Sequence, residues 1–275
     1  MKKVLITAKN SFVGNEVAKY LDGKYEIEKI SLRVDNWKNV SFAGVDCIFH
    51  VAGIAHIKET KENTHLYYDV NERLSIAVAE KAKAEGVKHF IVLSTMNVYG
   101  LTTGHITKNT RPNPVMIYGK SKLNADLAIE KMECPTFKVA ILRPPMIYGQ
   151  GCKGNYQTLR KFALKSPIFP SYKNERSMLF VGNLAAFVEG LIEKQKRGLF
   201  FPQDVEYVCT SDMVKKIDEQ NGKRIKTIGM FNWAISFILG LGVGVFKKVF
   251  GSLTYEKVDL VTENSFEEAI KMTEQ

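Results

Sequence analysis

Short apolar runs alternate with amphipathic segments along the first two thirds of the chain. Apolar runs of about four to eight residues predict buried strands, and apolar residues at helical spacing predict helices. The expected strands are residues 4–7, 25–32, 47–51, 90–93 and 138–142. The expected helices are residues 13–21, residues 71–85, which Gly86 closes, and the segment that carries Tyr118 and Lys122. Strands separated by helices predict an α/β fold with a Rossmann-type doubly wound parallel sheet, which binds ligands at the carboxyl ends of its strands.

The pattern loosens after about residue 145. A helix at residues 157–165, the prolines Pro167 and Pro170, and short strands indicate a smaller and less regular part. We therefore expect a dinucleotide-binding Rossmann domain over residues 1–150 and a small C-terminal substrate-binding part over residues 151–275. We expect the second part to be interleaved with the sheet around residues 178–200, and to pack closely on the first because no polar linker separates them.

Composition limits the classes of function that the chain can have. With 45% hydrophobic and 25% charged residues over 275 positions, the chain is typical of soluble, globular proteins. Its four cysteines include no Cys-x-x-Cys pair and its five histidines no pair at helical spacing, so we expect reduced thiols and no metal. Lys2-Lys3 leads directly into the first strand without a signal peptide, which favours a cytoplasmic location.

The net charge of +10 raises the question of a nucleic-acid or membrane partner. The lysines are spread along the chain, in clusters no longer than Lys215-Lys216 or Lys247-Lys248, and no basic stripe is interleaved with aromatic residues. We therefore expect a solvated basic surface that attracts anionic substrates, and no nucleic-acid partner.

A tyrosine and a lysine four residues apart carry the clearest chemical signal. Tyr118 and Lys122 fall on one helix face, one turn apart. A phenol has a pKa near ~10 in water, and a neighbouring ammonium group lowers it. Thr95, which follows the strand at residues 90–93, has a hydroxyl that can hold a substrate oxygen beside Tyr118. These three residues predict proton transfer to or from a sugar or alcohol oxygen.

The turn at residues 7–14 joins the first strand to the first helix. Together with the Tyr/Lys pair, it resembles the extended short-chain dehydrogenase/reductase family, which includes nucleotide-sugar epimerases, dehydratases and reductases. That family usually has Thr-Gly-x-x-Gly-x-x-Gly at this turn, whereas this chain keeps only the third glycine and has Ala8 and Ser11 at the other two positions. The cofactor-binding residues implied for this turn are Thr7, Ser11, Phe12, Val13 and Gly14. The alternative is an ordinary strand–helix turn without a ligand.

The resemblance extends to further residues of the cofactor site. It implies that Val51, Ala52 and Gly53 lie against the cofactor, that Asn71 steadies the site, and that Pro145 runs under the nicotinamide. We interpret His50 as a packed core histidine. Arg33, at the end of the second strand, favours NADP(H) over NAD(H), although a surface arginine of no consequence is an alternative. The third strand of the family and its acidic loop, which bracket the adenine, are nearly absent between Arg33 and Asp46.

For substrate, the resemblance implies a nucleotide sugar whose diphosphate meets Asn155 and Arg176. The catalytic residues that it implies are Thr95, Tyr118 and Lys122. The short chain, Arg33 and the segment Gly251-Ser252-Leu253, which resembles that of bacterial 4-keto-sugar reductases in surface-polysaccharide pathways, favour reduction of a 4-keto sugar nucleotide.

Two other functions stay open. A nucleotide-sugar 4-epimerase with bound NAD would use the same residues, and a non-catalytic dinucleotide-binding sensor protein could share the fold. The resemblance also implies a homodimer, formed through the helix that starts at Asn71 and the helix that carries Tyr118.

An apolar stretch of 17 residues at positions 230–246 has three interpretations. It can be a helix that roofs the substrate pocket, a membrane-surface helix with basic flanks, or a membrane span, for which it is short. The second interpretation would give a peripheral membrane contact through residues 230–248.

Overall fold

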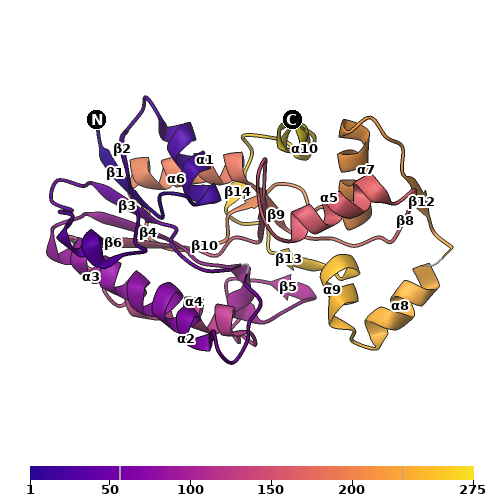
Figure 1. The fold of residues 1–275 in the computed structure, drawn as a ribbon, viewed down its shortest axis with the longest axis horizontal. Coiled ribbons are helices and arrows are strands. Elements are labelled where there is room, and N and C mark those ends of the chain that lie inside the picture. The colour runs from indigo at the N-terminus through magenta and orange to yellow at the C-terminus, as the bar shows by residue number, and fades with distance from the viewer. Residues whose placement is uncertain (56, 231) are drawn as a thin grey trace. The chain divides into compact units, whose positions relative to one another are not determined.

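The computed structural model describes residues 1–55, 57–230 and 232–275, and the chain divides into two compact units (Figure 1). Unit 1 comprises Met1–Gly100, Pro112–Pro144 and Leu184–Pro202. Unit 2 comprises Leu101–Arg111, Pro145–Asn183 and Gln203–Gln275. The chain therefore passes between the units several times, and each unit is built from segments that are distant in sequence.

A parallel sheet of six strands forms the centre of unit 1, as the alternation of strands and helices predicts. In spatial order the strands are β2 (Glu26–Ile30), β1 (Lys3–Thr7), β3 (Cys47–His50), β4 (His89–Leu93), β6 (Lys138–Leu142) and β10 (Gly198–Phe200). Strand β1 pairs with β2 on one side and with β3 on the other, so the strand order reverses beside β1. In open parallel sheets such a reversal leaves a crevice at the carboxyl ends of the strands.

Helices cover both faces of this sheet, with α1 and α6 on one face and α2, α3 and α4 on the other (Figure 1). The α-helices assigned to unit 1 are α1 (Phe12–Leu21), α2 (Thr64–Tyr67), α3 (Leu74–Ala84), α4 (Ile117–Glu130) and most of α6 (Val181–Lys194). Two short 3-10 helices, η1 (Asp35–Asn39) and η3 (Met96–Tyr99), and one π-helical turn, η2 (Tyr68–Arg73), complete unit 1.

The helix that was expected to begin at Asn71 begins earlier. Helical backbone starts at Thr64 and continues through the π-helical turn η2 into α3. Residues 58–65 are all polar, so no apolar periodicity marks where this helix begins, although Tyr67 is buried. Asn71 therefore lies inside the π-helical turn and not at the start of the helix.

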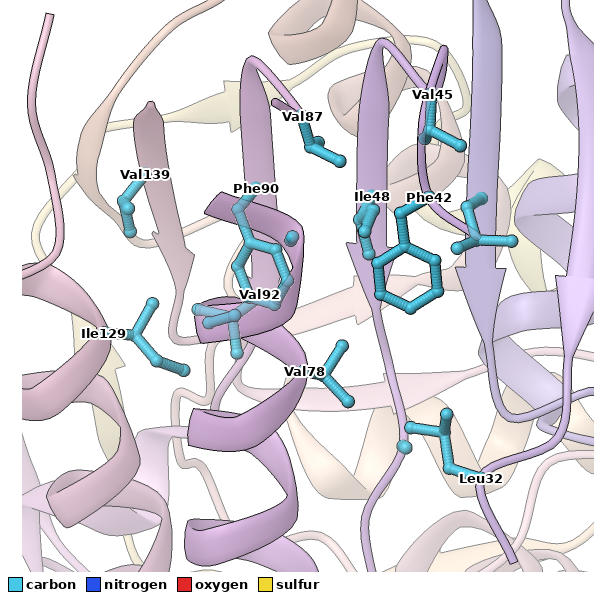
Figure 2. Close-up of a cluster of buried hydrophobic side chains, with 14 of the residues drawn as sticks. Leu32, Phe42, Val45, Ile48, Val78, Val87, Phe90, Val92, Ile129 and Val139 are labelled. Carbon is cyan, nitrogen blue, oxygen red and sulfur yellow. The ribbon is translucent and has the colours of Figure 1, made fainter. Parts of the chain in front are cut away.

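The core of unit 1 explains why its inner strands β1, β3, β4 and β6 are largely apolar runs. On one face of the sheet, Ile48, Phe90 and Val139 pack with Val78 of α3 and Ile129 of α4 (Figure 2). The residues on either side of Ile48 and Phe90 point to the other face of the sheet and are buried as well. A sheet covered on both faces has no polar alternation.

Among the described residues, no additional strand extends the sheet beyond β2. Residues 31–46, all of them described, form the 3-10 helix η1 and loops instead. Trp37 and Phe42 of this stretch are 3% and 0% exposed and belong to the core cluster. The short connection thus closes this edge of the core with two aromatic rings, in agreement with the sequence between Arg33 and Asp46.

In its described residues, unit 2 is built from short parallel strand pairs and five helices. The pairs are β5 (Gly104–Ile106) with β13 (Leu253–Tyr255), β7 (Met146–Tyr148) with β9 (Met178–Phe180), β8 (Ile168–Pro170) with β12 (Lys226–Ile228), and β11 (Gln203–Asp204) with β14 (Leu260–Val261). The helices are α5 (Asn155–Lys165), α7 (Thr210–Gln220), α8 (Asn232–Gly240), α9 (Gly244–Phe250) and α10 (Phe266–Glu274).

Buried polar contacts hold these short elements of unit 2 together. Asp204 accepts hydrogen bonds from the Phe180 amide at 3.0 Å, from Asn183 at 2.8 Å and from the Tyr148 hydroxyl at 3.2 Å. Burial raises the pKa of Asp204 to about 6. Because strands of two or three residues bring few ladder hydrogen bonds, such side-chain bonds fix their arrangement.

Candidate active site

The turn between β1 and α1 keeps the backbone of a glycine turn without the first glycine. Ala8 has a φ of 67°, in the left-handed region that glycine occupies without steric cost. The Ser11 amide donates to the Ala8 carbonyl at 2.8 Å, and the Lys9 amide donates to the Ile30 carbonyl of β2 at 3.0 Å. The Ala8 carbonyl and the amide of the next residue are therefore both hydrogen-bonded, and these bonds hold the turn in this conformation.

Ser11 caps the helix that follows this turn. Its hydroxyl accepts a hydrogen bond from the Gly14 amide at 3.2 Å, and its own backbone is extended. Within the described residues, the amides of Phe12 and Val13 in the same first turn have no hydrogen-bond partner. Free amides at a helix N-terminus are suited to an anion, above all a phosphate.

Gly14 allows α1 to pack closely on the sheet. A Cβ atom at this position would lie 3.1 Å from Val51 Cγ2 and 3.2 Å from Ile6 Cγ2. Thr7, at the end of β1, accepts hydrogen bonds through Oγ1 from the amides of Val51 at 3.0 Å and Ala52 at 3.2 Å. The buried Thr7 side chain thus fixes the backbone that leaves β3, and that backbone lies beside α1.

His50 is a packed core histidine, as its position within a strand indicates. It is 0% exposed, and its Nδ1 lies 3.1 Å from Thr7 Oγ1 and its Nε2 2.9 Å from Ser75 Oγ. Burial, together with the smaller effect of the charge of Lys122, lowers the pKa of His50 to about 3. The imidazole is therefore neutral at pH 7 and serves as a hydrogen-bonding link between β1, β3 and α3.

Asn71 connects the loop after β3 to the first turn of α4. Its Oδ1 accepts from the Ile54 amide at 2.8 Å, and its Nδ2 donates to the Ile54 carbonyl at 3.0 Å and to Ser121 Oγ at 3.2 Å. A Cβ atom on Gly53 would lie 3.0 Å from Asn71 Oδ1, so a larger residue there would crowd the Asn71 side chain. The side chain is fully buried and holds the loop 51–54 in place against α4.

The start of α4 is fixed by a carboxylate from a distant loop. The amides of Ile117 and Tyr118 donate to Glu59 Oε2 and Oε1 at 3.0 and 2.9 Å. A Cβ atom on Gly119 would lie 2.6 Å from the Asn97 carbonyl, so α4 approaches the segment after β4 as closely as a glycine permits. These contacts place Tyr118 near Thr95, whose hydroxyl also accepts from the Asn97 amide at 3.2 Å.

The electrostatics of Tyr118 differ from the sequence prediction. Burial raises the pKa of Tyr118 to about 12; a hydrogen bond with the Thr95 side chain lowers it, and the charge of Asp126 raises it. The net direction is opposite to the lowered pKa that the spacing of Tyr118 and Lys122 predicts, because desolvation of the phenolate is the largest cause. The phenol is therefore protonated at neutral pH.

Lys122 is almost fully buried, at 3% exposure. Burial lowers the pKa of Lys122, and the negative charge of Asp126 acts in the opposite direction. Asp126 is the next residue on the same helix face, four positions further along α4. It keeps a negative charge close to the lysine.

Asp126 is a site residue that the sequence prediction missed. Its Oδ2 accepts from Ser94 Oγ at 2.7 Å and from Arg143 Nε at 3.0 Å, and Arg143 also donates to the Tyr99 hydroxyl at 3.1 Å. Asp126 Oδ1 has no hydrogen-bond partner in the part of the chain that the structure describes. Only the spacing of four residues from Lys122 could have indicated this carboxylate.

Arg33 lies just beyond β2 and is exposed. Its amide is 3.4 Å from Ser31 Oγ, and among the described residues its side chain forms no ion pair; the neighbouring Asp35 pairs with Lys38 at 3.1 Å. The guanidinium is therefore available to a ligand at this edge of the sheet.

The remaining predicted residues, Pro145, Asn155 and Arg176, belong to unit 2. Pro145 is buried, and Asn155 is the exposed first residue of α5. Arg176 Nη1 donates to the Gly251 carbonyl at 2.7 Å, and its backbone pairs with Val208. Burial lowers the pKa of Arg176, and within the described residues no carboxylate forms an ion pair with it. The structure thus joins Arg176 to the segment Gly251-Ser252-Leu253.

The chain as a whole matches a known family. The model described as the NAD dependent epimerase/dehydratase family matches residues 4–199, well over half of the chain. The chain belongs to this family. It is accordingly an NAD(P)-dependent enzyme of the extended short-chain dehydrogenase/reductase type, and the central parallel sheet is the Rossmann-type sheet of that family.

Curated relatives and solved structures include both epimerases and reductases. The chain is 27% identical to the UDP-glucose 4-epimerase of Vibrio cholerae over 78% of this chain and 75% of that protein. It is 28% identical to the N-acetyl-alpha-D-glucosaminyl-diphospho-ditrans,octacis-undecaprenol 4-epimerase of Escherichia coli O157:H7, over 68% of this chain but only 58% of that protein. Its fold is similar to dTDP-4-dehydrorhamnose reductase from Bacillus anthracis in complex with NADP, with a TM-score of 0.75, 17% identity and 99% coverage of both chains.

The structure of unit 1 fits the dinucleotide that this family binds. Two amides at the start of α1 have no partner among the described residues, a Cβ atom at Gly14 or Gly53 would be crowded, and the turn lies where the strand order reverses. These features together suit a pyrophosphate at the N-terminus of α1. Among the described residues, no group of three His, Cys, Asp or Glu side chains could hold a metal ion.

Proposed function

We propose that this enzyme reduces the keto group of a 4-keto sugar nucleotide with NADPH, in the biosynthesis of a surface polysaccharide. The observation that carries the proposal is the arrangement of Tyr118, Thr95 and Lys122 in unit 1, with a phenol that is protonated at neutral pH. A protonated phenol is a proton donor, and reduction of a carbonyl needs a proton at the oxygen.

Each of the three side chains has one role in this proposal. When bound, the reduced nicotinamide supplies a hydride to the carbonyl carbon. Tyr118 donates its proton to the carbonyl oxygen, which becomes the hydroxyl, and the phenolate that remains regains a proton from solvent. Thr95 donates a hydrogen bond to the same oxygen. Lys122 stabilises the phenolate with its charge, and Asp126 favours the charged form of Lys122.

The cofactor roles follow the geometry of unit 1. Ser11, Phe12 and Val13 at the start of α1 would bind the pyrophosphate, and Gly14 permits the close packing behind it. The loop of Val51, Ala52 and Gly53, which Thr7 and Asn71 hold, would lie against the adenosine half. Arg33 would pair with a 2′-phosphate, which supports NADP(H) over NAD(H).

In unit 2, Arg176 and Asn155 would anchor the diphosphate of the sugar nucleotide, and Pro145 would line the nicotinamide. A guanidinium without a carboxylate partner among the described residues supports this role for Arg176. The division into a dinucleotide domain over residues 1–150 and a substrate-binding part over 151–275 is part of the proposal. So is a homodimer through the helix expected from Asn71, which corresponds to the end of η2 and to α3, and through α4, where Leu127 is 45% exposed.

A 4-epimerase is the second candidate, because both curated relatives named above are 4-epimerases. It would keep NAD bound and return the hydride to the opposite face of a rotated keto intermediate. The name of the Escherichia coli relative also extends the candidate substrates to sugars linked through a diphosphate to a polyprenol.

The purified protein distinguishes these candidates. Stoichiometric NADPH oxidation with a 4-keto sugar nucleotide supports the reductase, whereas dinucleotide that copurifies and interconversion of UDP-sugars support the epimerase. Cofactor binding without turnover of either kind would indicate a dinucleotide sensor. In each enzymatic case, Tyr118→Phe should reduce kcat by about 10²- to 10⁴-fold, the usual range for loss of a general acid or base, with the cofactor Kd little changed. If Tyr118→Phe kept most of the activity, that result would contradict the role of Tyr118 in proton transfer.

A further inference from the structure

Helix α8 of unit 2 presents large apolar side chains to solvent. Trp233 and Phe237 are 75% and 65% exposed, and Leu241, just after the helix, is 66% exposed. Their spacing of four residues places them on one side of the helix. Met230, before the helix, is 70% exposed. We call these four residues the apolar face.

The opposite side of α8 is anchored in unit 2. Ile235 is 5% exposed, Asn232 Nδ2 donates to the Ser171 carbonyl at 3.3 Å, and Ser236 Oγ is 3.3 Å from the Tyr172 hydroxyl. A turn with Gly242 at a φ of 82° joins α8 to α9, and the two helices pack on each other (Figure 1).

Helix α9 is fixed in turn by aromatic contacts. The ring of Phe250 lies 5.8 Å from that of Phe169 and 5.9 Å from that of Tyr172. The hairpin of α8 and α9 is thus attached through its inner side, and the apolar face points outward because the anchored side already packs on the protein.

The charges around the apolar face all have one sign. Residues 221–255 contain five cationic residues and no Asp or Glu. The five are Lys223, Arg224, Lys226, Lys247 and Lys248. All are exposed except Lys247, which is half-buried and whose Nζ lies 3.7 Å from the position of a Cβ atom on Gly242, at the turn of the hairpin. Cations therefore stand on both sides of the apolar face in the sequence, and one lies at its tip.

We propose that the apolar face docks this enzyme on an anionic lipid bilayer, with α8 lying in the headgroup region. Exposed Trp and Phe side chains beside lysines are the composition of helices that bind at a membrane surface. Anionic headgroups complement five cations that no carboxylate of the segment neutralises. No helix of the ranges 1–55, 57–230 and 232–275 is long and apolar enough to cross a membrane, so a contact of this kind would lie along the surface.

Charge also separates this occupant from a second copy of the chain. Two copies joined through the apolar face would bring two sets of like charges together, in a protein with a net charge of +10. The membrane contact is independent of the proposed reaction, because it requires neither Tyr118 nor the cofactor.

Vesicle sedimentation and tryptophan fluorescence test the proposal with the full-length protein. We expect cosedimentation with vesicles of phosphatidylglycerol and phosphatidylcholine and little with phosphatidylcholine alone. Binding should shift the Trp233 emission to the blue, and brominated lipids should quench it. The only other tryptophan, Trp37, is 3% exposed, so the variant Trp233→Phe measures the constant fluorescence background of Trp37. Trp233→Ser with Phe237→Ser should lower the partition coefficient at least ~tenfold, and Lys247→Glu with Lys248→Glu should do the same.

The matched control is Lys61→Glu with Lys131→Glu, which makes the same change of charge at exposed lysines elsewhere. It should bind like the parent protein, and unchanged thermal melting should show that each variant is folded. Three results would overturn the proposal. The first is no binding to anionic vesicles at low salt. The second is binding that shows neither a blue shift nor quenching and that the control variant loses to the same extent. The third is self-association in the absence of lipid that Trp233→Ser abolishes.

Discussion

Replacing Ala8 by glycine removes a steric cost that the turn before α1 carries. Ala8 has a φ of 67°, which its Cβ atom disfavours, and hydrogen bonds of the Ser11 and Lys9 amides hold the turn in that shape. The family has a glycine at this position. Ala8→Gly should therefore leave the structure of the turn unchanged and stabilise unit 1.

The magnitude follows from two opposing terms. A left-handed conformation costs an L-residue with a Cβ atom about 1–2 kcal/mol. Glycine loses more backbone entropy on folding than alanine, which offsets about 0.5–1 kcal/mol of the gain. The middle of each range gives a net stabilisation of about 0.7 kcal/mol, or about 1–3 °C in Tm for a chain of this size.

Thermal unfolding measured by circular dichroism, with calorimetry to separate transitions of the two units, gives the result. Ala186→Gly is the matched control, because Ala186 lies inside α6 in unit 1, where glycine should cost about 1 kcal/mol. The two variants should move Tm in opposite directions. If Ala8→Gly lowers Tm as Ala186→Gly does, Ala8 is not in the left-handed conformation and the argument about the turn fails.

Three further predictions follow from the described contacts. His50 and His89 have pKa values lowered by burial to about 3 and about 4, so the unfolded chain binds their protons first as the pH falls. The free energy of unfolding should thus decrease below about pH 6.5, by about 2 kcal/mol for each histidine at pH 5. Urea titrations should show that it decreases less steeply with falling pH in His50→Gln than in the parent protein. Asp126→Asn removes the carboxylate of a buried ion pair with Arg143 and should cost about 3–5 kcal/mol in urea unfolding, whereas a loss below 1 kcal/mol would mean that the pair is solvated. Arg176→Leu should raise KM for the sugar nucleotide at least ~tenfold with kcat less affected, and an unchanged KM in steady-state assays would remove Arg176 from the diphosphate site.

The inner strands of unit 1 could be predicted because they are apolar on both faces. All residues of β3, and those of β4 from His89 to Val92, are buried, so the apolar runs mark these strands directly. The start of the helix at Thr64 could not be located in the same way, because its first residues are polar. The cap of α4 could not be predicted either, because Glu59 is 58 residues distant from Ile117. Contacts at that separation have no local pattern.

The electrostatics of the site could be predicted only in part. The spacing of Tyr118 and Lys122 places them on one helix face, but their pKa values depend on how deeply the fold buries them. Asp126, which opposes the effect of burial on Lys122, is held by Ser94 and Arg143 from two other segments. The sequence thus contains the pair but not the dielectric environment that decides its chemistry.

That environment bears on the direction of the proposed reaction. Burial raises the pKa of Tyr118 to about 12, so the phenol is protonated at pH 7. To act first as a base, as an epimerase starting from an alcohol requires, Tyr118 would need its pKa lowered on binding. A proton donor to a keto sugar needs no such shift. The buried phenol and the turn that has lost two family glycines therefore support the same candidate, a reductase that binds and releases its cofactor in each cycle.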